Sequence, residues 1–350
     1  MPIRTTCIGA YPKPDFVQLP DWFNLPAGPD VANPTRHWRA AMDKLGDDAE
    51  SLISRGVERV LQDQLNAGID IPTDGEIPRE NYIHYHCRHL NGFDFDKLTA
   101  RSLRNGAYMA ELPTIVGPVS PRQLFMQKEW KRAQQFTDRP VKITMPGPMT
   151  VSDTNADDFY HDPVALGGDI ADALNAEVRA LADAGCQHIQ IDEPLFARRP
   201  EDALSYGFEN LERAFHQCPK NVTRTVHMCC GYPDRIDNPN YPKADPQAYM
   251  DLVSAVDYSS VNAVSFEDAH RPNDLKLLES LTNTVAILGV VAIAQSRIET
   301  IEEIELRLKR ALLHIDADRL IAAPDCGLGL LDRSQAIAKL TNLCAAASRI

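Results

Sequence analysis

The stretch Val222-Thr-Arg-Thr-Val-His-Met-Cys229 is a short β-like run that leads directly into metal-binding side chains. Two later stretches share this form: Val261–Glu267 ends in a glutamate, and Leu320–Cys326 ends in a cysteine. An α/β barrel gathers the residues that follow its strands on one rim, so that residues roughly 100 positions apart in sequence meet there. The three stretches therefore predict a barrel whose rim brings these side chains together.

The side chains at these strand ends are His227, Cys229, Glu267 and Cys326. Two thiols, an imidazole and a carboxylate suit Zn²⁺, which accepts nitrogen, sulfur and oxygen ligands in a tetrahedral arrangement. The His-x-Cys spacing lacks the Cys-x2-Cys pattern of a zinc finger, so the prediction depends on the shared strand-end position. The alternative is a buried histidine and two buried thiols without a metal, because free cysteine is among the most buried residue types. We favour zinc.

Composition limits the class of protein. The chain has 350 residues and a net charge of −13, which argues against a nucleic-acid partner because phosphates require a basic face. Apolar runs such as Val285–Ala294 are shorter than the roughly 20 residues of a membrane span. Met1–Cys7 has no apolar signal-peptide core, and the eight cysteines do not follow a secreted disulfide pattern. We expect a cytoplasmic protein with reduced thiols and no membrane partner.

Eight β-like runs, most of them short and rich in Val, Ile or Thr, are spread along the chain, as expected for strands buried on both faces. They are Thr5–Gly9, Gly68–Pro72, Val141–Met145, Gln187–Ile191, Val222–Val226, Val261–Phe266, Thr284–Ile293 and Leu320–Pro324. Eight strands alternating with helices predict an α/β fold, a (β/α)8 TIM barrel that forms one catalytic domain over residues 1–350. The alternative is a doubly wound open sheet, but no Gly-rich phosphate turn follows the first run.

Helical patterns lie between the later runs. Pro163–Ala184 has apolar residues at three- and four-residue spacing and is followed by Gly185, a C-cap signal. Asn273–Leu281 and Ile301–His314 show similar patterns, and the latter has acidic residues in its first turns and basic residues later. These segments are the expected outer helices of the barrel.

Three segments interrupt the alternation of strands and helices. They are predicted to be insertions at the rim, near residues 15–50, 77–140 and 231–247. Asp15–Asp30 is rich in proline and aromatic residues, among them Trp22 and Phe23, and predicts an irregular loop near the mouth. Residues 77–140 are long for one crossover and predict an extra hairpin or helices. Pro233–Pro246 contains four prolines. Long irregular loops in compact domains are usually functional.

Acidic residues end two other runs. Ile189-Gln-Ile-Asp192-Glu193-Pro194 ends in two adjacent carboxylates, and Asp74-Gly75-Glu76 follows the second run. At a barrel rim these acids are expected over the cavity, where they bind a substrate amine or a hard cation. Structural alternatives remain, because Asp192 could cap the next helix and Glu193 could pair with an arginine.

A second group of metal-binding residue types lies at His84, His86, Cys87 and His89. The spacing of His84 and His86 suits one face of a strand, whereas the other two do not extend that pattern. Isolated histidines usually form only hydrogen bonds, so we do not assign a metal to this cluster. Cys230 is a further candidate ligand, but a continued strand would point its side chain away from Cys229.

Taken in order, these motifs resemble the cobalamin-independent methionine synthase family, specifically its catalytic C-terminal barrel in a short, barrel-only form. The resemblance rests on the following pieces: Thr5–Pro12, similar to TTxIGSFP; Asp74-Gly-Glu76, Arg79 and Asn91-Gly-Phe93, similar to HGE…R…DGF; Ile189–Pro194, similar to IQIDEP; and the set His227, Cys229, Glu267, Cys326. It implies a (β/α)8 barrel in which zinc binds the thiol of homocysteine, whose sulfur then accepts a methyl group to give methionine.

The resemblance also implies site residues. Glu76 and Asp192 would be the catalytic residues that hold the homocysteine amino group. Glu193, Ile8 and Gly9 would complete the substrate site. His227, Cys229, Glu267 and Cys326 would be the zinc ligands.

Two departures from the family pattern bear on the substrate and the donor. Ala10 replaces a serine that helps to bind the substrate carboxylate, and Ala294 replaces a histidine that helps to protonate the departing folate. A methylcorrinoid, or a corrinoid protein, is therefore an alternative donor to methyltetrahydrofolate.

Other hypotheses about the function of the barrel remain open. They are a zinc-dependent alkyltransferase acting on a coenzyme M-like thiol, a decarboxylase of the uroporphyrinogen type, and a non-catalytic zinc- or thiol-binding barrel. The decarboxylase shares the barrel but has no zinc ligands, so the four-residue set counts against it. The oligomeric state is left open.

Overall fold

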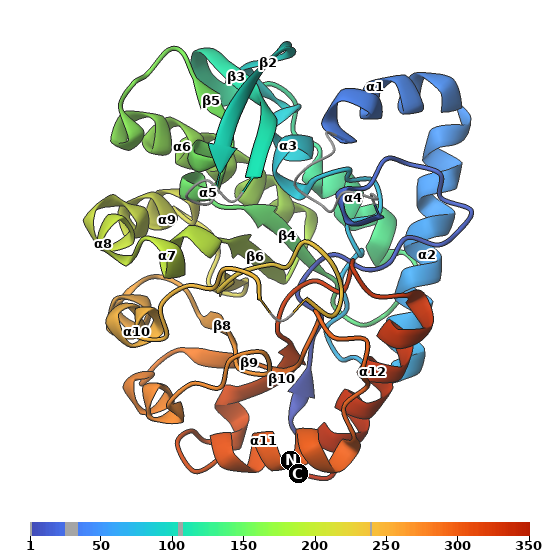
Figure 1. Cartoon of the computed structure of the whole chain (residues 1–350), viewed down its shortest axis with the longest axis vertical. Helices are drawn as coiled ribbons and strands as arrows, with labels where there is room; N and C mark the ends of the chain where they lie inside the picture. Colours follow the sequence, from blue (N-terminus) through green and yellow to red (C-terminus); the bar gives the residue numbers. More distant parts are fainter. Residues whose placement is uncertain (1, 25–33, 104–107, 239) are drawn as a thin grey trace.

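The computed structural model describes residues 2–24, 34–103, 108–238 and 240–350. Its main sheet contains seven parallel strands in the order β1-β10-β9-β8-β7-β6-β4, which curl around the centre of the molecule with helices outside them (Figure 1). These strands are β1 (Arg4–Thr5), β4 (Lys142–Pro146), β6 (His188–Asp192), β7 (Thr223–Met228), β8 (Ala263–Glu267), β9 (Val285–Val291) and β10 (Leu320–Pro324).

Seven of the eight predicted runs overlap a strand of this sheet, although the first does so only at Thr5. Gly68–Pro72 was predicted to be a strand and forms none, which fits Pro72, since proline has no N–H for a sheet. Two single parallel bridges, Thr6 to Ile71 and Thr73 to Lys142, connect this segment to the sequence near β1 and to β4. The segment therefore lies between the two edges of the curled sheet.

Strand register brings the predicted site residues to one edge. Asp192 at the end of β6 is aligned with His227 in β7, and His227 is aligned with Ser265 in β8. Glu267 ends β8 beside Gly289 in β9. Because all of these pairs are parallel, the carboxyl ends of the strands carry their side chains to the same rim.

Most helices flank the sheet on its outer side or cover the rim, and within the described residues short 3-10 turns and a π-helical turn accompany them. They are η1 (Trp22–Asn24), α1 (Pro34–Leu45), α2 (Asp48–Ala67), α3 (Tyr82–Cys87), α4 (Met126–Gln134), α5 (Pro148–Asp153), α6 (Pro163–Ala184), α7 (Pro194–Arg198), α8 (Pro200–Asp202), η2 (Ala203–Gly207), α9 (Phe208–Ala214), α10 (Ala248–Tyr258), η3 (Leu275–Ser280), α11 (Ile301–Ala311), η4 (Ala317–Arg319) and α12 (Arg333–Ala347).

Helix α6 has the bounds that its sequence pattern predicts. The Asp162 carboxylate accepts hydrogen bonds from the N–H groups of Val164 and Ala165, and Gly185 ends the helix with φ of 106°. The predicted helix Ile301–His314 is confirmed as α11, three residues shorter. Asn273–Leu281 does not form an α-helix but the 3-10 turn η3.

The segments predicted as rim insertions contain the following elements. Residues 77–140 hold α3, α4 and a long antiparallel hairpin of β2 (Leu90–Leu103) and β3 (Tyr108–Pro121), which projects at the top of Figure 1. Strand β3 also pairs with the short β5 (Ala156–Asp157). The described residues of 231–247 form no helix or strand, and part of 15–50 lies outside the described residues.

Every residue of β4, β8 and β10 is buried, as expected where helices cover one face of a parallel sheet and side chains fill the other. The two chain ends meet, since Ile3 N–H donates to the carbonyl of Ala347. Among the described residues, no helix combines the length and the apolar character that crossing a membrane requires.

Candidate active site

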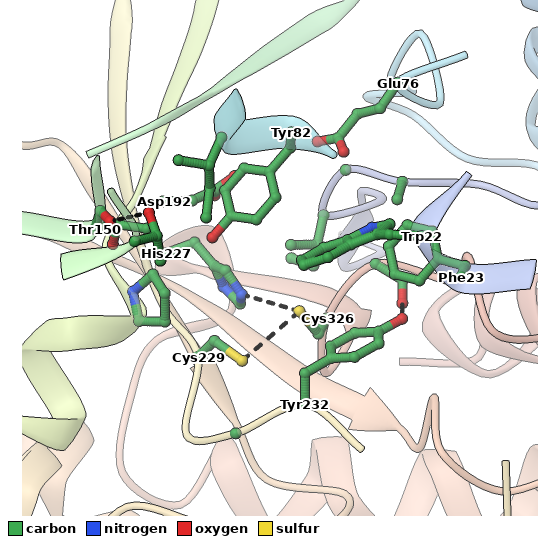
Figure 2. A pocket seen from close by; sticks show the side chains of 18 of the residues that line it. Trp22, Phe23, Glu76, Tyr82, Thr150, Asp192, His227, Cys229, Tyr232 and Cys326 are labelled. Atoms are coloured by element: carbon green, nitrogen blue, oxygen red, sulfur yellow. Dashed lines mark hydrogen bonds between the residues drawn. The ribbon is translucent and has the colours of Figure 1, made fainter. Parts of the chain in front are cut away.

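The side chains of His227, Cys229, Glu267 and Cys326 lie together at the rim and are called the four-ligand group below. Their candidate ligand atoms all lie within 4.8 Å of one another. His227 Nε2 is 3.4 Å from Cys326 Sγ, which is 3.8 Å from Cys229 Sγ (Figure 2). Strands β7 and β8 and the turn after β10 each contribute to the group, so the structure brings together the residues that the strand ends predict to be neighbours.

The orientation of His227 suits metal binding. Its Nδ1 lies 2.9 Å from the hydroxyl of Ser265 on the adjacent strand. When Nδ1 carries the proton and donates it to this hydroxyl, the lone pair of Nε2 is directed at the cysteine sulfurs. A metal-binding histidine is normally held in this way through its second ring nitrogen.

The group is acidic, and its side chains are buried except for Cys326, which is half-buried. The Cys326 thiol donates to Cys229 Sγ, and this contact lowers the pKa of Cys229 well below its usual range. Burial raises the pKa of Glu267 well above its usual range, and the nearby Cys229 raises it further. Three acidic groups packed this closely repel one another once ionised, and a divalent cation would remove that repulsion.

Only one of the two oxygens of the Glu267 carboxylate accepts a hydrogen bond within the described residues. Its Oε2 accepts a hydrogen bond from the Cys230 thiol at 2.5 Å, whereas the buried Oε1 has no hydrogen-bond partner among the described residues. An unpartnered buried oxygen beside two sulfurs and one ring nitrogen fits a Zn²⁺ ligand set. Cys230 was a candidate ligand, but it lies outside the four-ligand group and supports Glu267 instead.

A cavity opens beside the four-ligand group. The cavity has a volume of about 100 Å³, which suits a small substrate. Its lining combines three ligand-group residues with two acidic residues predicted from the rim, Glu76 and Asp192. Ile8 and Gly9 also line it, so the structure places these four predicted substrate residues around one space.

A hydrogen bond from Gln190, on the same strand β6, orients the Asp192 carboxylate. Gln190 Nε2 donates to Asp192 Oδ1 at 2.7 Å and to the carbonyl of Ile8 at 2.8 Å. Burial raises the pKa of Asp192 to about 7, and the negative charge of Glu76 contributes. Asp192 does not cap the following helix, because the N-cap residue of α7 is Glu193.

Glu76 is held in a strained turn. Its φ is 57°, in the left-handed region that residues other than glycine rarely adopt. Thr144 donates to its Oε1 at 2.6 Å, and the Arg79 guanidinium lies 3.4 Å from the same oxygen. Gly9 leaves room for this carboxylate, because a Cβ there would lie 2.6 Å from Glu76 Oε1.

Glu193 does not reach the cavity, contrary to the prediction. Its carboxylate accepts hydrogen bonds from the N–H groups of Met149 and Thr150 and from the Thr150 hydroxyl, at 2.7 to 3.1 Å. It therefore caps the first turn of α5. Consecutive residues at a strand end point to opposite sides, so Asp192 and Glu193 cannot both face the cavity.

In the histidine cluster after the second run, His84, His86 and Cys87 lie on helix α3, not on a strand, and His89 follows the helix. Asn81 begins this helix by accepting hydrogen bonds from the N–H groups of Ile83 and His84. His84 contacts the Thr35 hydroxyl and the Thr154 carbonyl. In the part of the chain that the structure describes, the four-ligand group is the only set of three or more metal-binding side chains found together.

Sequence reasoning missed two tyrosines that line the cavity, Tyr82 and Tyr232. Tyr82 is the first residue of α3, and the helix N-cap at Asn81 was a signal that could have placed it. Tyr232 lies in the predicted insertion directly after the Cys229 segment. Trp22 and Phe23, which made the loop at 15–30 aromatic, line the same cavity.

Fold and site together define an α/β protein with a curled parallel sheet and a candidate metal-dependent active site at the strand ends. The chain belongs to the family described as cobalamin-independent synthase, catalytic domain, which matches residues 25–349.

Individual proteins agree with this assignment. A methionine synthase from Saccharolobus solfataricus is 27% identical over 343 residues, covering 97% of this chain and 92% of that protein. A B12-independent methionine synthase from Shewanella sp. W3-18-1, solved in complex with selenomethionine, is 30% identical with a TM-score of 0.85 and coverage of 99% and 97%. A methyltransferase from Methanosarcina mazei shares the fold, with a TM-score of 0.60, 14% identity and coverage of 99% and 94%.

The descriptions of the family and of the Shewanella protein bear on the identity of the methyl donor. Both the family and the Shewanella protein are described as independent of cobalamin or B12. The corrinoid partner that the sequence raised as an alternative therefore has no support from the comparisons.

Proposed function

We propose that this protein is a zinc-dependent methyltransferase that converts homocysteine to methionine in the cavity beside the four-ligand group. The observation that carries the proposal is that two sulfur ligands and two rim carboxylates, Glu76 and Asp192, line the same small space. The family assignment and the relatives named methionine synthase support it. The Shewanella protein, described with selenomethionine bound, supports an amino acid of this shape as the ligand.

The two carboxylates favour an amino-acid thiol over other thiols. Glu76 and Asp192 would accept charge-assisted hydrogen bonds from the substrate ammonium group, and each such bond contributes about 1.5–3 kcal/mol. A coenzyme M-like thiol carries a negative sulfonate and no amine, so the same carboxylates would repel it. We therefore keep homocysteine as the acceptor.

The four-ligand group would hold the zinc ion. A free alkyl thiol has a pKa near 8.5, and a bound zinc ion would lower it, so that the substrate sulfur is a thiolate at neutral pH. Ser265 keeps the Nε2 atom of His227 directed into the group, and Cys230 fixes one oxygen of Glu267. All eight cysteines are free, and we infer a reducing, cytoplasmic setting that keeps the two cysteine ligands available.

Matched cysteine variants test the proposal. The purified protein should contain about one zinc per chain, as a four-ligand site implies. Cys326→Ser should lose most of the zinc and the conversion of homocysteine to methionine, while Cys344→Ser, at another partly buried cysteine outside the group, should keep both. Full zinc content in Cys326→Ser would refute the ligand assignment.

We also infer that residues 1–350 form one domain and that its sheet closes as a (β/α)8 barrel. The bridges from Thr6 to Ile71 and from Thr73 to Lys142 support this closure, because they span the two edges of the seven-stranded sheet. An experimental structure should show the segment around Ile71 hydrogen-bonded to both neighbours. An open gap at this position would contradict the closure.

A further inference from the structure

The proposed function leaves one charged group of the substrate without a partner. Homocysteine carries an ammonium group and a carboxylate on the same carbon atom, and Glu76 and Asp192 have the wrong charge to bind the carboxylate. Moving an ionised carboxylate out of water into a cavity is costly unless a cation or several hydrogen-bond donors receive it. A cavity that binds this amino acid therefore needs a positive group close to the two rim carboxylates.

Arg198 is the positively charged side chain that lines the cavity. Among the described lining residues, it is the only lysine or arginine. It is the last residue of α7, and this helix starts directly after Asp192, which ends β6, and Glu193, which is the N-cap residue. The segment from β6 to α7 thus brings an acidic group and a basic group to the same cavity.

Few contacts within the protein engage the guanidinium of Arg198. Its Nε donates to the carbonyl of Pro194 at 3.4 Å, a distance at the long end for a hydrogen bond, and within the described residues no carboxylate forms an ion pair with it. The side chain is half-buried. A guanidinium binds a carboxylate most strongly through two parallel N–H···O bonds, and the two terminal nitrogens of Arg198 are available for such a pair.

The next residue, Arg199, has a different partner. Its Nη2 lies 2.8 Å from Asp153 Oδ1, and Arg199 is not among the described lining residues. Asp153 does line the cavity, so Arg199 balances the charge of this carboxylate. Arg198 is therefore not needed as the counter-ion of Asp153, and its positive charge is available to a ligand.

The two threonine hydroxyls that line the cavity are already engaged. The Thr150 hydroxyl donates to the carboxylate of Glu193 at 2.7 Å, and the Thr154 hydroxyl donates to the carbonyl of Thr150 at 2.6 Å. Ala10 also lines the cavity, and its methyl group cannot donate a hydrogen bond. A guanidinium is thus the strongest donor that these lining residues offer to a carboxylate.

The charges of Asp192 and Arg198 act on the same aromatic ring. Tyr82 points into the cavity (Figure 2). Burial raises the pKa of the Tyr82 phenol well above its usual range, the negative charge of Asp192 raises it further, and the positive charge of Arg198 lowers it. Asp192 and Arg198 therefore both lie within electrostatic reach of Tyr82, as is required of two groups that bind the ammonium group and the carboxylate of one amino acid.

We propose that Arg198 binds the α-carboxylate of homocysteine and so selects α-amino-acid thiols as acceptors. This inference rests on the proposed function, in which homocysteine is the acceptor. The guanidinium donates two N–H···O hydrogen bonds to the carboxylate, while Glu76 and Asp192 accept hydrogen bonds from the ammonium group. With two substituents of the α-carbon held, the direction of the third, which carries the thiol, is fixed as well.

Matched thiols test this assignment in the zinc-loaded full chain. The compound 3-aminopropane-1-thiol has the amine and the thiol of homocysteine and lacks only its carboxylate. In titration calorimetry, the wild type should bind homocysteine roughly 10- to 100-fold more tightly than 3-aminopropane-1-thiol, as expected when a charge-assisted hydrogen bond is lost. Arg198→Met should remove most of this preference by weakening the binding of homocysteine alone, and Arg198→Lys should retain part of it.

Controls separate recognition of the carboxylate from damage to the fold or to the metal site. Arg179→Met, at an exposed position of α6, should leave both affinities unchanged, and Arg198→Met should keep the zinc content of the wild type. An unchanged homocysteine affinity in Arg198→Met, or an equal loss for both thiols, overturns the inference and leaves the proposed function intact. Failure of both thiols to bind the wild type refutes the proposed function and the inference with it.

Discussion

Asp192 is the residue whose position says most about the acceptor. It lines the cavity, and Gln190 and burial fix its carboxyl group there. Asp192→Asn should weaken homocysteine binding roughly 10- to 100-fold, which corresponds to the loss of one charge-assisted hydrogen bond of about 1.5–3 kcal/mol. The matched ligand 4-mercaptobutyrate lacks only the amine, and its affinity should change little. Titration calorimetry with both thiols checks this, and equal losses would remove Asp192 from amine recognition.

Ser265 is not a ligand, but we expect it to affect the zinc affinity of the site. Its hydroxyl is 2.9 Å from His227 Nδ1, so Ser265→Ala leaves the imidazole without its orienting partner. We expect zinc affinity to fall about 10- to 100-fold, as is usual when the partner of a metal-binding histidine is lost. Competition with a zinc chelator measures the change, and Ser152→Ala, whose hydroxyl only contacts the carbonyl of Pro148, is the control. Unchanged zinc affinity would show that this contact does not orient His227.

At the scale of single residues, the sequence predicted which residues lie at the strand ends better than it predicted where their side chains point. Strand ends predicted the proximity of the four ligand residues, because parallel strands share a rim. Glu193 was misplaced because it follows Asp192 directly and so points to the opposite side, toward α5. Tyr82 was missed because the helix cap at Asn81 was not recognised. Tyr232 could not be placed, since it approaches the cavity from a loop whose path depends on tertiary packing.

At the scale of elements, the Glu193 carboxylate connects the end of β6 to the first turn of α5. The buried carboxylate accepts three hydrogen bonds from Met149 and Thr150, and Gly147 gives it room. Glu193→Ala should lower the free energy of unfolding by about 1–3 kcal/mol, because buried N–H groups lose their partners. Chemical denaturation measures this, and Glu209→Ala, on an exposed position of α9, is the control. Equal stability of the two variants would contradict the capping role.

Elements with clear end signals were the ones that the sequence predicted well. Helix α6 has an Asp N-cap and a Gly C-cap, and both bounds were predicted correctly. His84 and His86 were assigned to a strand pattern, but the Asn81 cap and the following hydrogen bonds make a short helix. The long hairpin β2–β3 was expected only as a hairpin or helices, because most of its pairing depends on partners that lie many residues away, up to Leu90 with Pro121.

At the scale of the whole molecule, buried titratable groups make stability depend on pH. Burial lowers the pKa of His84 to about 4, so the folded protein favours its neutral form. This contribution to stability is fully present above the unfolded pKa of about 6.5 and is lost as pH falls toward 4, where the loss reaches roughly 3 kcal/mol. Buried acids such as Asp325, with a pKa raised to about 7, act in the opposite direction over the same range.

A substitution of His84 separates its contribution to the pH dependence of stability from that of the buried acids. The difference in unfolding free energy between the wild type and His84→Gln should shift by roughly 3 kcal/mol between pH 7 and pH 4, with the wild type losing the advantage of its neutral imidazole. Urea titrations at a series of pH values measure this difference. A difference that stays constant over that range would show that His84 does not titrate differently in the folded and unfolded states.

The central claim is that a zinc ion held by His227, Cys229, Glu267 and Cys326 receives the sulfur of homocysteine. Zinc X-ray absorption spectroscopy tests it most directly, because sulfur and nitrogen or oxygen neighbours are distinguished by distance, with zinc–sulfur bonds near 2.3 Å. The account predicts two sulfur neighbours in the protein alone and three after homocysteine is added. A sulfur count that does not change when homocysteine is added would contradict it.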